Sequence, residues 1–233
     1  MWKKLHIIIF SVPCILIFSY NALSQDILSN LLDILPLEFE IGCWSIYEVK
    51  DFSTKTTVLL REAITGEEML NNQKCYWLEA EVIPTIGFPS IYRFLIQPEK
   101  NGKHKILKIV VREGANLPET YLSESVQSQE EKSNARKKFI KEEEIEYKSG
   151  KIKAKHYTIK TEEKEVEVWT TSEIKPLGLV KLRSKDGEVT LIRYGKGGEE
   201  AKSNLEISTR RDYKSEEDKK SKNGDVAVKV EKE

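Results

Sequence analysis

The sequence contains few of the residues that most often carry out catalysis or bind metals. Its 233 residues include three histidines and three cysteines. Neither His104 nor His156 lies in a recognisable motif or close to a cysteine in the sequence, so these residue types do not indicate a metal site. The chain has no G-x-S-x-G nucleophile motif and no G-x-x-x-x-G-K-[ST] phosphate loop. The sequence therefore predicts no cofactor, no metal and no enzymatic activity.

The chain also lacks net charge. Its 38 lysines and arginines balance 38 aspartates and glutamates, which gives a formal net charge of +0 at pH 7. Proteins that bind nucleic acid or anionic membranes through electrostatic attraction carry an excess of positive charge. We therefore expect no nucleic-acid partner.

Long apolar runs are missing everywhere except at the N-terminus. Lys3 and Lys4 precede the apolar stretch 5–20, and Ala22-Leu23-Ser24 matches a small-x-small cleavage site. This stretch is shorter than the ~20 residues that a transmembrane helix needs. Residues 1–24 are predicted to be a secretory signal peptide, with an uncleaved N-terminal anchor as the alternative. We therefore expect a periplasmic or secreted protein with no membrane span after cleavage.

Two cysteines lie beyond the signal peptide, Cys43 and Cys75. An even number of cysteines in an exported protein makes them a candidate disulfide. Each lies in a predicted strand, and a third predicted strand, 56–63, separates them. In a simple meander the two would be ~9.6 Å apart, from the ~4.8 Å spacing of strands, whereas a disulfide needs Cα atoms within ~7 Å. A bond and two buried free thiols both remain open.

Alternation of apolar and polar residues dominates the chain after a short amphipathic segment. Asp26–Pro36 has the spacing of a short helix. Asp186-Gly187, between two alternating segments, predicts a tight hairpin, and residues 115–135 are predicted to be a loop, with a short helix as an option within it. The predicted strands are Ile41–Val49, Thr54–Ile64, Lys74–Ile83, Ile91–Gln97, Lys105–Glu113, Lys141–Tyr147, Lys151–Thr161, Glu163–Thr170, Leu177–Ser184 and Glu188–Tyr194.

These segments predict a mainly β protein. Tight turns at Thr65-Gly66, Asn71-Asn72, Asn101-Gly102 and Ser149-Gly150 favour an antiparallel meander curled into a half-open or closed β-barrel, with one short N-terminal helix. The predicted domains are the signal peptide 1–24, a single β domain 25–198 and a charged, largely disordered C-terminal tail 199–233.

Side chains alternate across a strand, so each predicted strand can be divided into two faces. One face is continuous and apolar, and it must be covered by the curl of the sheet, a helix or a ligand. It carries Tyr76, Leu78, Ala80, Val82, Tyr92, Phe94, Ile96, Leu107, Ile109, Val111, Val166, Val168, Val180 and Leu182.

The opposite face is polar, and two interpretations of it are open. Cross-strand charge pairs are typical of a solvated outer face. The tryptophans on this face instead suggest a surface that contacts a ligand or a partner, because large aromatic residues are enriched at interfaces. The candidate contact residues are Trp77, Glu79, Arg93, Trp169 and Lys181. Glu79 and Glu81 also form a carboxylate pair of the kind that a hydrolase acting on envelope sugars uses.

Several short motifs resemble an uncharacterised group of bacterial exported proteins. The resemblance covers about residues 41–195 and implies no assigned activity. Its motifs are W-x-x-Y-x-V at Trp44, Tyr47 and Val49, Y-W-L-E at Tyr76–Glu79, and V-W followed by P-L-G-L-V-K at Val168, Trp169 and Pro176–Lys181.

The predicted architecture is also distantly similar to the lipoprotein carriers of the bacterial envelope and their sensor relatives. Those proteins wrap an antiparallel sheet around an apolar cavity that accepts acyl chains. This similarity implies an exported, non-enzymatic envelope protein that binds a lipid, a lipoprotein acyl chain or an envelope protein on its apolar sheet face. An envelope hydrolase and a purely structural envelope protein are the alternatives.

Overall fold

The structure, a computed structural model, describes residues 35, 37–99, 104–122, 136–160 and 165–205. The predicted signal peptide, the predicted Asn101-Gly102 turn and nearly all of the predicted helix Asp26–Pro36 lie outside these residues. Within the described ranges, no helix is long and apolar enough to cross a membrane.

In the described residues, eleven strands form one antiparallel sheet in the order β6-β5-β4-β3-β2-β1-β11-β10-β9-β8-β7. The mainly β, antiparallel fold class is therefore confirmed. The strands are β1 (Cys43–Asp51), β2 (Thr56–Leu70), β3 (Gln73–Pro84), β4 (Ser90–Pro98), β5 (His104–Glu113), β6 (Glu119–Leu122), β7 (Arg136–Tyr147), β8 (Gly150–Lys160), β9 (Glu165–Thr170), β10 (Leu179–Arg183) and β11 (Gly187–Lys196).

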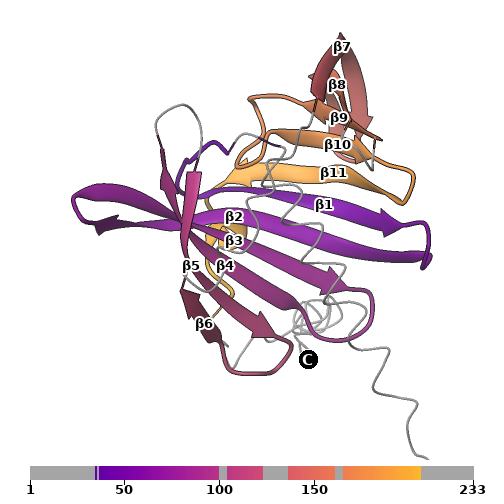
Figure 1. The fold of residues 1–233 in the computed structure, drawn as a ribbon. Coiled ribbons are helices and arrows are strands. Elements are labelled where there is room, and N and C mark those ends of the chain that lie inside the picture. Colours follow the sequence, from indigo (N-terminus) through magenta and orange to yellow (C-terminus); the bar gives the residue numbers. More distant parts are fainter. Residues whose placement is uncertain (1–34, 36, 100–103, 123–135, 161–164, 206–233) are drawn as a thin grey trace, which may run out of the picture.

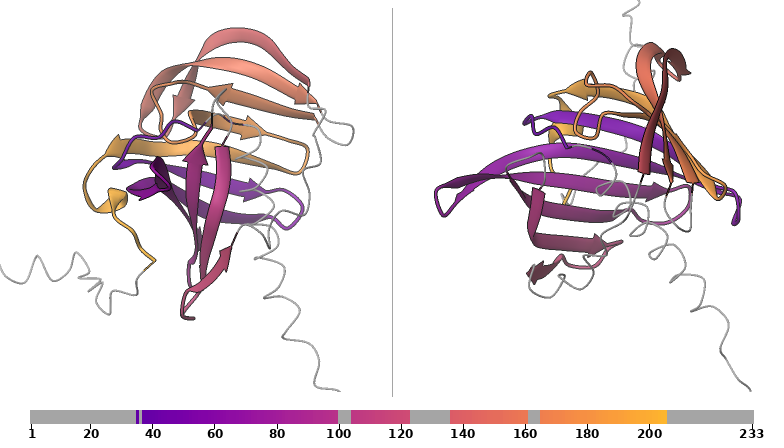
Figure 2. Two further views of the ribbon diagram at one scale, coloured as in Figure 1. Left: turned by 60° about the vertical axis from the view of Figure 1, so that its left-hand side comes forward. Right: turned by 45° about the horizontal axis from the view of Figure 1, so that its top comes forward.

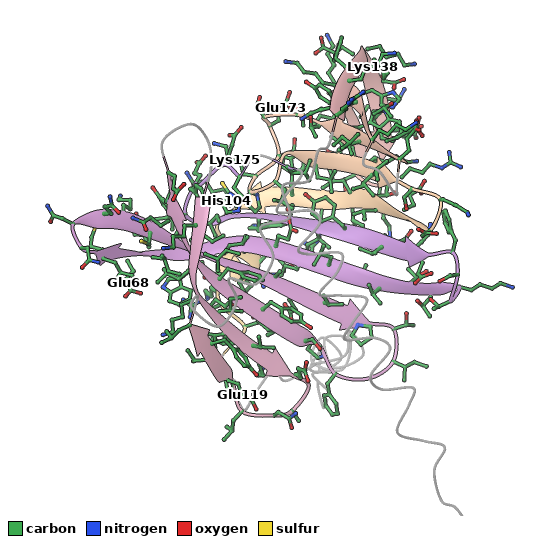
Figure 3. The ribbon with its side chains drawn as sticks, viewed as in Figure 1. Glu68, His104, Glu119, Lys138, Glu173 and Lys175 are labelled. Atoms are coloured by element: carbon green, nitrogen blue, oxygen red, sulfur yellow. The ribbon has the colours of Figure 1, made fainter. Side chains whose placement is uncertain are left out.

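The sheet consists of two meanders that meet at the ladder between β1 and β11. The first meander runs from β1 to β6, and the second runs from β7 back to β11, which pairs with β1. The two edge strands β6 and β7 lie at opposite ends of the sheet (Figure 1), as Glu119 on β6 and Lys138 on β7 show in Figure 3. The alternative of a closed barrel is wrong, because no ladder joins β6 to β7. The strand direction rotates strongly along the sheet (Figure 2).

Ten of the strands match the ten predicted segments, and the differences have local causes. β2 continues through the predicted Thr65-Gly66 turn. The pairing with β3 shifts between Ile64 and Gly66, so the strand has an irregularity there instead of a turn. The turn comes at Asn71 and Asn72, whose positive φ values of 48° and 64° suit a tight hairpin. The short edge strand β6 lies in the predicted loop 115–135, and all four of its residues are exposed.

The apolar face predicted from the sequence forms the main hydrophobic core, and we call it the inner face. Its centre includes Tyr47, Leu60, Leu78 and Val168, which are at most 2% exposed. On β5 the predicted positions of Ile109 and Val111 are confirmed, and that of Leu107 is wrong. On β5, Ile106 contributes to this core instead of Leu107, because the ladder with β4 shifts by one residue between Leu95 and Ile96.

Two segments outside the strands pack on the inner face. The segment before β1 contributes Leu35, Leu37 and Phe39, and the β9–β10 loop contributes Ile174 and Leu177. The two segments are joined to each other: the Glu38 amide donates to the Pro176 carbonyl at 2.8 Å, and Lys175 pairs with Glu40. Figure 3 shows Lys175 and Glu173 on this loop.

Gly178 ends the β9–β10 loop for a steric reason. Its φ is +67°, and a Cβ atom at this position would lie 2.9 Å from the Thr171 carbonyl oxygen. The Thr171 amide donates to the Gly178 carbonyl at 2.8 Å and closes the loop. Pro176 and Gly178 thus turn the chain between β9 and β10, which are neighbours in the sheet.

The free end of the second meander folds back toward β11. The Ser149 hydroxyl, in the β7–β8 turn, donates to the Ile192 carbonyl at 2.7 Å. The rings of Tyr147 and Tyr194 lie 6.3 Å apart, centroid to centroid. Residues 199–205, which belong to the predicted C-terminal tail, also pack on the sheet. The rest of the predicted tail lies outside the described residues.

Candidate functional site

The carboxylate pair Glu79 and Glu81 lies on the polar side of β3, which we call the outer face. The Arg61 side chain on β2 reaches both carboxylates, with its Nη1 atom 3.1 Å from Glu79 and 3.3 Å from Glu81. All three side chains are buried, at 1%, 0% and 4% exposure for Arg61, Glu79 and Glu81. Buried charges of this kind are retained when they are paired and hydrogen-bonded.

The chain itself covers this ion cluster. Residues 199–205 lie over the outer face of β2 and β3, where Glu200 accepts a hydrogen bond from Arg61 Nε through its carbonyl at 2.9 Å. The Asn204 amide donates to Glu79 at 2.8 Å, and its side chain donates to Glu81 at 2.6 Å. Every partner named here comes from the chain itself, and the two carboxylates are almost completely buried by it.

A second group on the outer face is centred on Trp77. The Arg93 guanidinium lies 4.4 Å from the centroid of the indole, and the indole N–H donates to Glu68 at 3.3 Å. Next to it, Ile91, Val110 and Leu205 form a small second hydrophobic core that Trp77 joins. The outer face of β3–β5 is therefore neither fully solvated nor an open aromatic surface.

The other two candidate contact residues lie in the second meander. Trp169 on β9 and Lys181 on β10 are direct cross-strand partners. Trp169 is only 9% exposed, its ring is stacked on His156 at 4.2 Å, and its N–H donates to Glu143 at 2.8 Å. Lys181 forms an ion pair with Glu188 at 3.0 Å. The indole and the lysine therefore make their contacts within the sheet.

The five candidate contact residues thus form two groups. Trp77, Glu79 and Arg93 lie together on β3 and β4, whereas Trp169 and Lys181 lie on β9 and β10. The strands β2, β1 and β11 separate the two groups in the sheet. The structure does not combine them into one binding surface.

Cys43 and Cys75 are free and buried. They lie on β1 and β3, with β2 between them, and they are offset along the strands. Cys75 faces Glu68 on β2, whereas the residue after Cys43, Trp44, faces Ala63. Burial raises the pKa of both thiols. Within the described ranges, no group of three or more His, Cys, Asp or Glu side chains is placed to hold a metal ion.

A different polar cluster lies on the inner face, at the centre of the sheet. Ser45 and Tyr47 project from β1 on the same side as the core residue Leu60, and Glu62 projects from β2 directly opposite Ser45. Ser45 and Tyr47 are 0% exposed and Glu62 is 2% exposed. We call these three residues the inner polar cluster.

The inner polar cluster has buried polar atoms without well-formed hydrogen bonds. The Ser45 hydroxyl, the Tyr47 hydroxyl and the Glu62 Oε2 atom have no partner of good geometry among the described residues, although the Ser45 hydroxyl lies close enough to Tyr47 to oppose the rise in the tyrosine pKa. Leaving such a group unpaired costs ~1–3 kcal/mol, so unpaired buried polar atoms require an explanation.

Burial also keeps the Glu62 carboxyl neutral at physiological pH. Desolvation raises its pKa from 4.5 to about 8, and no basic side chain opposes this effect. Burial likewise raises the pKa of the Tyr47 hydroxyl. At pH 7 the cluster therefore presents hydrogen-bond donors and acceptors without charge, surrounded by apolar side chains.

The sequence contains a signal for this cluster. Glu62 follows the apolar alternation of Leu60 and Ile64, so the pattern L-x-E-x-I places a carboxyl on the apolar face of the strand. The more conspicuous carboxylate pair in the sequence, Glu79 and Glu81, lies on the outer face, where both carboxylates have hydrogen-bond partners.

Comparisons with known proteins identify no family. No family model matches the chain, and no curated protein matches its sequence. The chain is similar to a solved structure from Parabacteroides distasonis ATCC 8503, provisionally described as a lipoprotein, with 11% identity, a TM-score of 0.37 and coverage of 69% of this chain and 98% of that chain.

A second solved structure, from Bacteroides fragilis NCTC 9343, is provisionally described as an exported protein with a YmcC-like fold. It has 10% identity and a TM-score of 0.37, and the match covers 70% of this chain and 99% of that chain. At this level of similarity neither structure decides the fold or the function of this chain.

Proposed function

We propose that this protein is exported to the periplasm or beyond the cell, and that it binds an amphiphile, a lipid or a lipoprotein acyl chain, against the inner face without catalysing a reaction. One observation carries the proposal: a continuous apolar face extends across both meanders of an open sheet. The predicted signal peptide, with its basic start and its Ala22-Leu23-Ser24 site, supports export.

The shape of the sheet supports a binding role as well. The second meander folds back so that the β7–β8 turn contacts β11. The direction of the strands changes along the sheet, as Figure 2 shows. The sheet carries its apolar surface on one side, and its edge strands β6 and β7 are not joined. Acyl chains fit such surfaces because burying each CH₂ group contributes ~0.8 kcal/mol.

The hydrolase alternative has less support. Glycoside hydrolysis needs two carboxyl groups that face a substrate, separated by ~5–9.5 Å. Glu79 and Glu81 instead share Arg61 and are covered by residues 199–205. We therefore propose a binding protein and not an enzyme.

Native mass spectrometry of the protein purified from its own host tests the proposal. We expect a co-purified lipid, and a fluorescent fatty-acyl probe should bind the delipidated protein. Val82→Lys places a charge on the inner face and should weaken probe binding at least tenfold, whereas the matched outer-face variant Thr57→Lys should not. Recovery without lipid together with no probe binding would instead indicate a structural envelope protein.

A further inference from the structure

We propose that the inner polar cluster is a subsite that binds the carbonyl group of an ester- or amide-linked acyl chain. The inference rests on the proposed function, and it specifies which part of the amphiphile the protein recognises. Glu62 and Tyr47 each present a buried polar atom without a partner, on the face that carries the main core. A ligand atom at this point would supply the missing hydrogen bonds.

The chemistry of the cluster selects the type of ligand group. A protonated carboxyl and two hydroxyls supply three O–H donors, and a ligand group that accepts hydrogen bonds can receive them. A carbonyl oxygen has two acceptor lone pairs and carries no charge. An anionic headgroup fits poorly, because no basic side chain contributes to the pKa of Glu62 and a buried negative charge would be unpaired.

The neighbours of the cluster on the inner face are small or apolar, as an acyl chain that continues from the carbonyl requires. Glu62 faces Ala80 on β3, which has the smallest side chain in the inner-face row Tyr76, Leu78, Ala80 and Val82. On the other side, Ser45 faces Tyr194 on β11. The apolar residues of β2–β4 then extend away from the cluster toward β5. An acyl carbonyl is the point at which a polar group and an apolar chain meet, which matches this arrangement.

The test uses probes that differ only at the carbonyl. The delipidated full-length protein is titrated calorimetrically with 1-palmitoylglycerol, which has an ester, with N-palmitoylethanolamine, which has an amide, and with 1-O-hexadecylglycerol, which has an ether and no carbonyl. We expect the ester, the amide or both to bind about tenfold more tightly than the ether, which is the contribution of one or two net hydrogen bonds. A preference for the ester indicates a glycerolipid, and a preference for the amide indicates an N-acylated ligand.

Variants assign the preference to the cluster. Glu62→Leu should bind all three probes equally, Tyr47→Phe should reduce the preference, and Glu62→Gln, which keeps an N–H donor, should retain part of it. Glu48→Leu, on the opposite side of β1, is the matched control and should behave like the wild type. Urea unfolding of each variant checks that it is folded.

Two results would overturn the inference and separate it from the proposed function. If the wild type binds the ether as tightly as the ester and the amide, or if Glu62→Leu keeps the full preference, the cluster does not recognise a carbonyl although the inner face still binds amphiphiles. If none of the three probes binds, the proposed function itself is wrong.

Discussion

Glu62 and Glu79 are buried glutamates on adjacent strands, but they face opposite sides of the sheet. Glu79 accepts hydrogen bonds from Arg61, Ser203 and the Asn204 amide. The Glu62 Oε2 atom has no partner among the described residues, and burial raises the pKa of the Glu62 carboxyl to about 8. The C-terminal segment therefore supplies partners for Glu79 on the outer face, whereas the described residues supply none for the Glu62 Oε2 atom on the inner face.

This difference separates the structural role of Glu79 from the binding role that we propose for Glu62. A buried carboxylate with an arginine and several donors holds elements together, here β2, β3 and residues 199–205. A buried carboxyl without partners costs folding free energy, and a ligand that supplies the missing hydrogen bonds recovers it. The same residue type thus stabilises the fold on the outer face and is proposed to bind a ligand on the inner face.

The largest expected effect is the pH dependence caused by Glu62. Its pKa is raised from 4.5 to about 8 in the folded protein. Between these pH values the folded chain keeps a proton that the unfolded chain has released, so the free energy of unfolding falls as the pH rises. The total loss is ~5 kcal/mol by pH 9, from the 1.36 kcal/mol that corresponds to one pKa unit. It is complete above the folded pKa.

Urea unfolding at pH 4.5, 6, 7.5 and 9 measures this loss, with Glu62→Gln as the comparison. The amide does not ionise, so the variant should lose that component and become more stable than the wild type at pH 9. Four residues on β1, β3 and β11 surround Glu62, and none of them titrates below pH 8: Ser45, Tyr47, Ala80 and Tyr194. Equal pH dependence in the two proteins would show that Glu62 is ionised or solvated.

The next effect is the loss of Arg61. Arg61→Met leaves Glu79 and Glu81 buried without their cation and should lower the free energy of unfolding by ~4 kcal/mol at pH 7. Arg193→Met is the control, because this arginine is half exposed and its pair with Glu200 should contribute less than ~1 kcal/mol. Similar losses in the two variants would contradict the structural role of the buried cluster.

A smaller effect is expected at the C-terminal cover of the outer face. Asn204→Ala removes the side-chain donor to Glu81 and keeps the backbone donor to Glu79, so the stability should fall by ~2 kcal/mol. Hydrogen exchange measured by mass spectrometry should also become faster in residues 199–205. Unchanged exchange would mean that this hydrogen bond does not hold the segment on the sheet.

The smallest effect concerns the second group of candidate contact residues. Lys181→Met removes the ion pair with Glu188 while the Trp169–His156 stack remains, and it should change the stability by less than ~1 kcal/mol. Binding of the acyl probe should not change. A marked loss of probe binding in this variant would move the binding surface from the inner face to the second meander.

Most of the sheet could be predicted from the sequence, because period-two alternation and turn residues are local signals. Asn71-Asn72 and Asp186-Gly187 mark hairpins, and the valines of β9 and β10 lie on the predicted face. The one-residue shift between β4 and β5 was not predictable, because it depends on how two strands pair and not on either strand alone. The order of the strands, with β11 beside β1, is equally a long-range property.

The surroundings of the candidate site residues could be predicted less well than the sheet. The outer-face tryptophans were conspicuous by residue type, but their contacts with Arg93, His156 and Glu143 lie within the chain. The cover over Glu79 comes from residues more than one hundred positions away in the sequence, which no local pattern reveals. Glu62 could have been found from its place in the alternation, although its lack of partners is visible only in the folded structure.

Photo-crosslinking tests most directly whether the inner face is the binding face. The delipidated protein is incubated with a palmitoyl ester that carries a diazirine in its chain, irradiated, and mapped to single residues by tandem mass spectrometry. We expect labels on inner-face side chains such as Leu60, Leu78 and Phe94. Labels confined to outer-face positions such as Trp77 and Arg93 would contradict it.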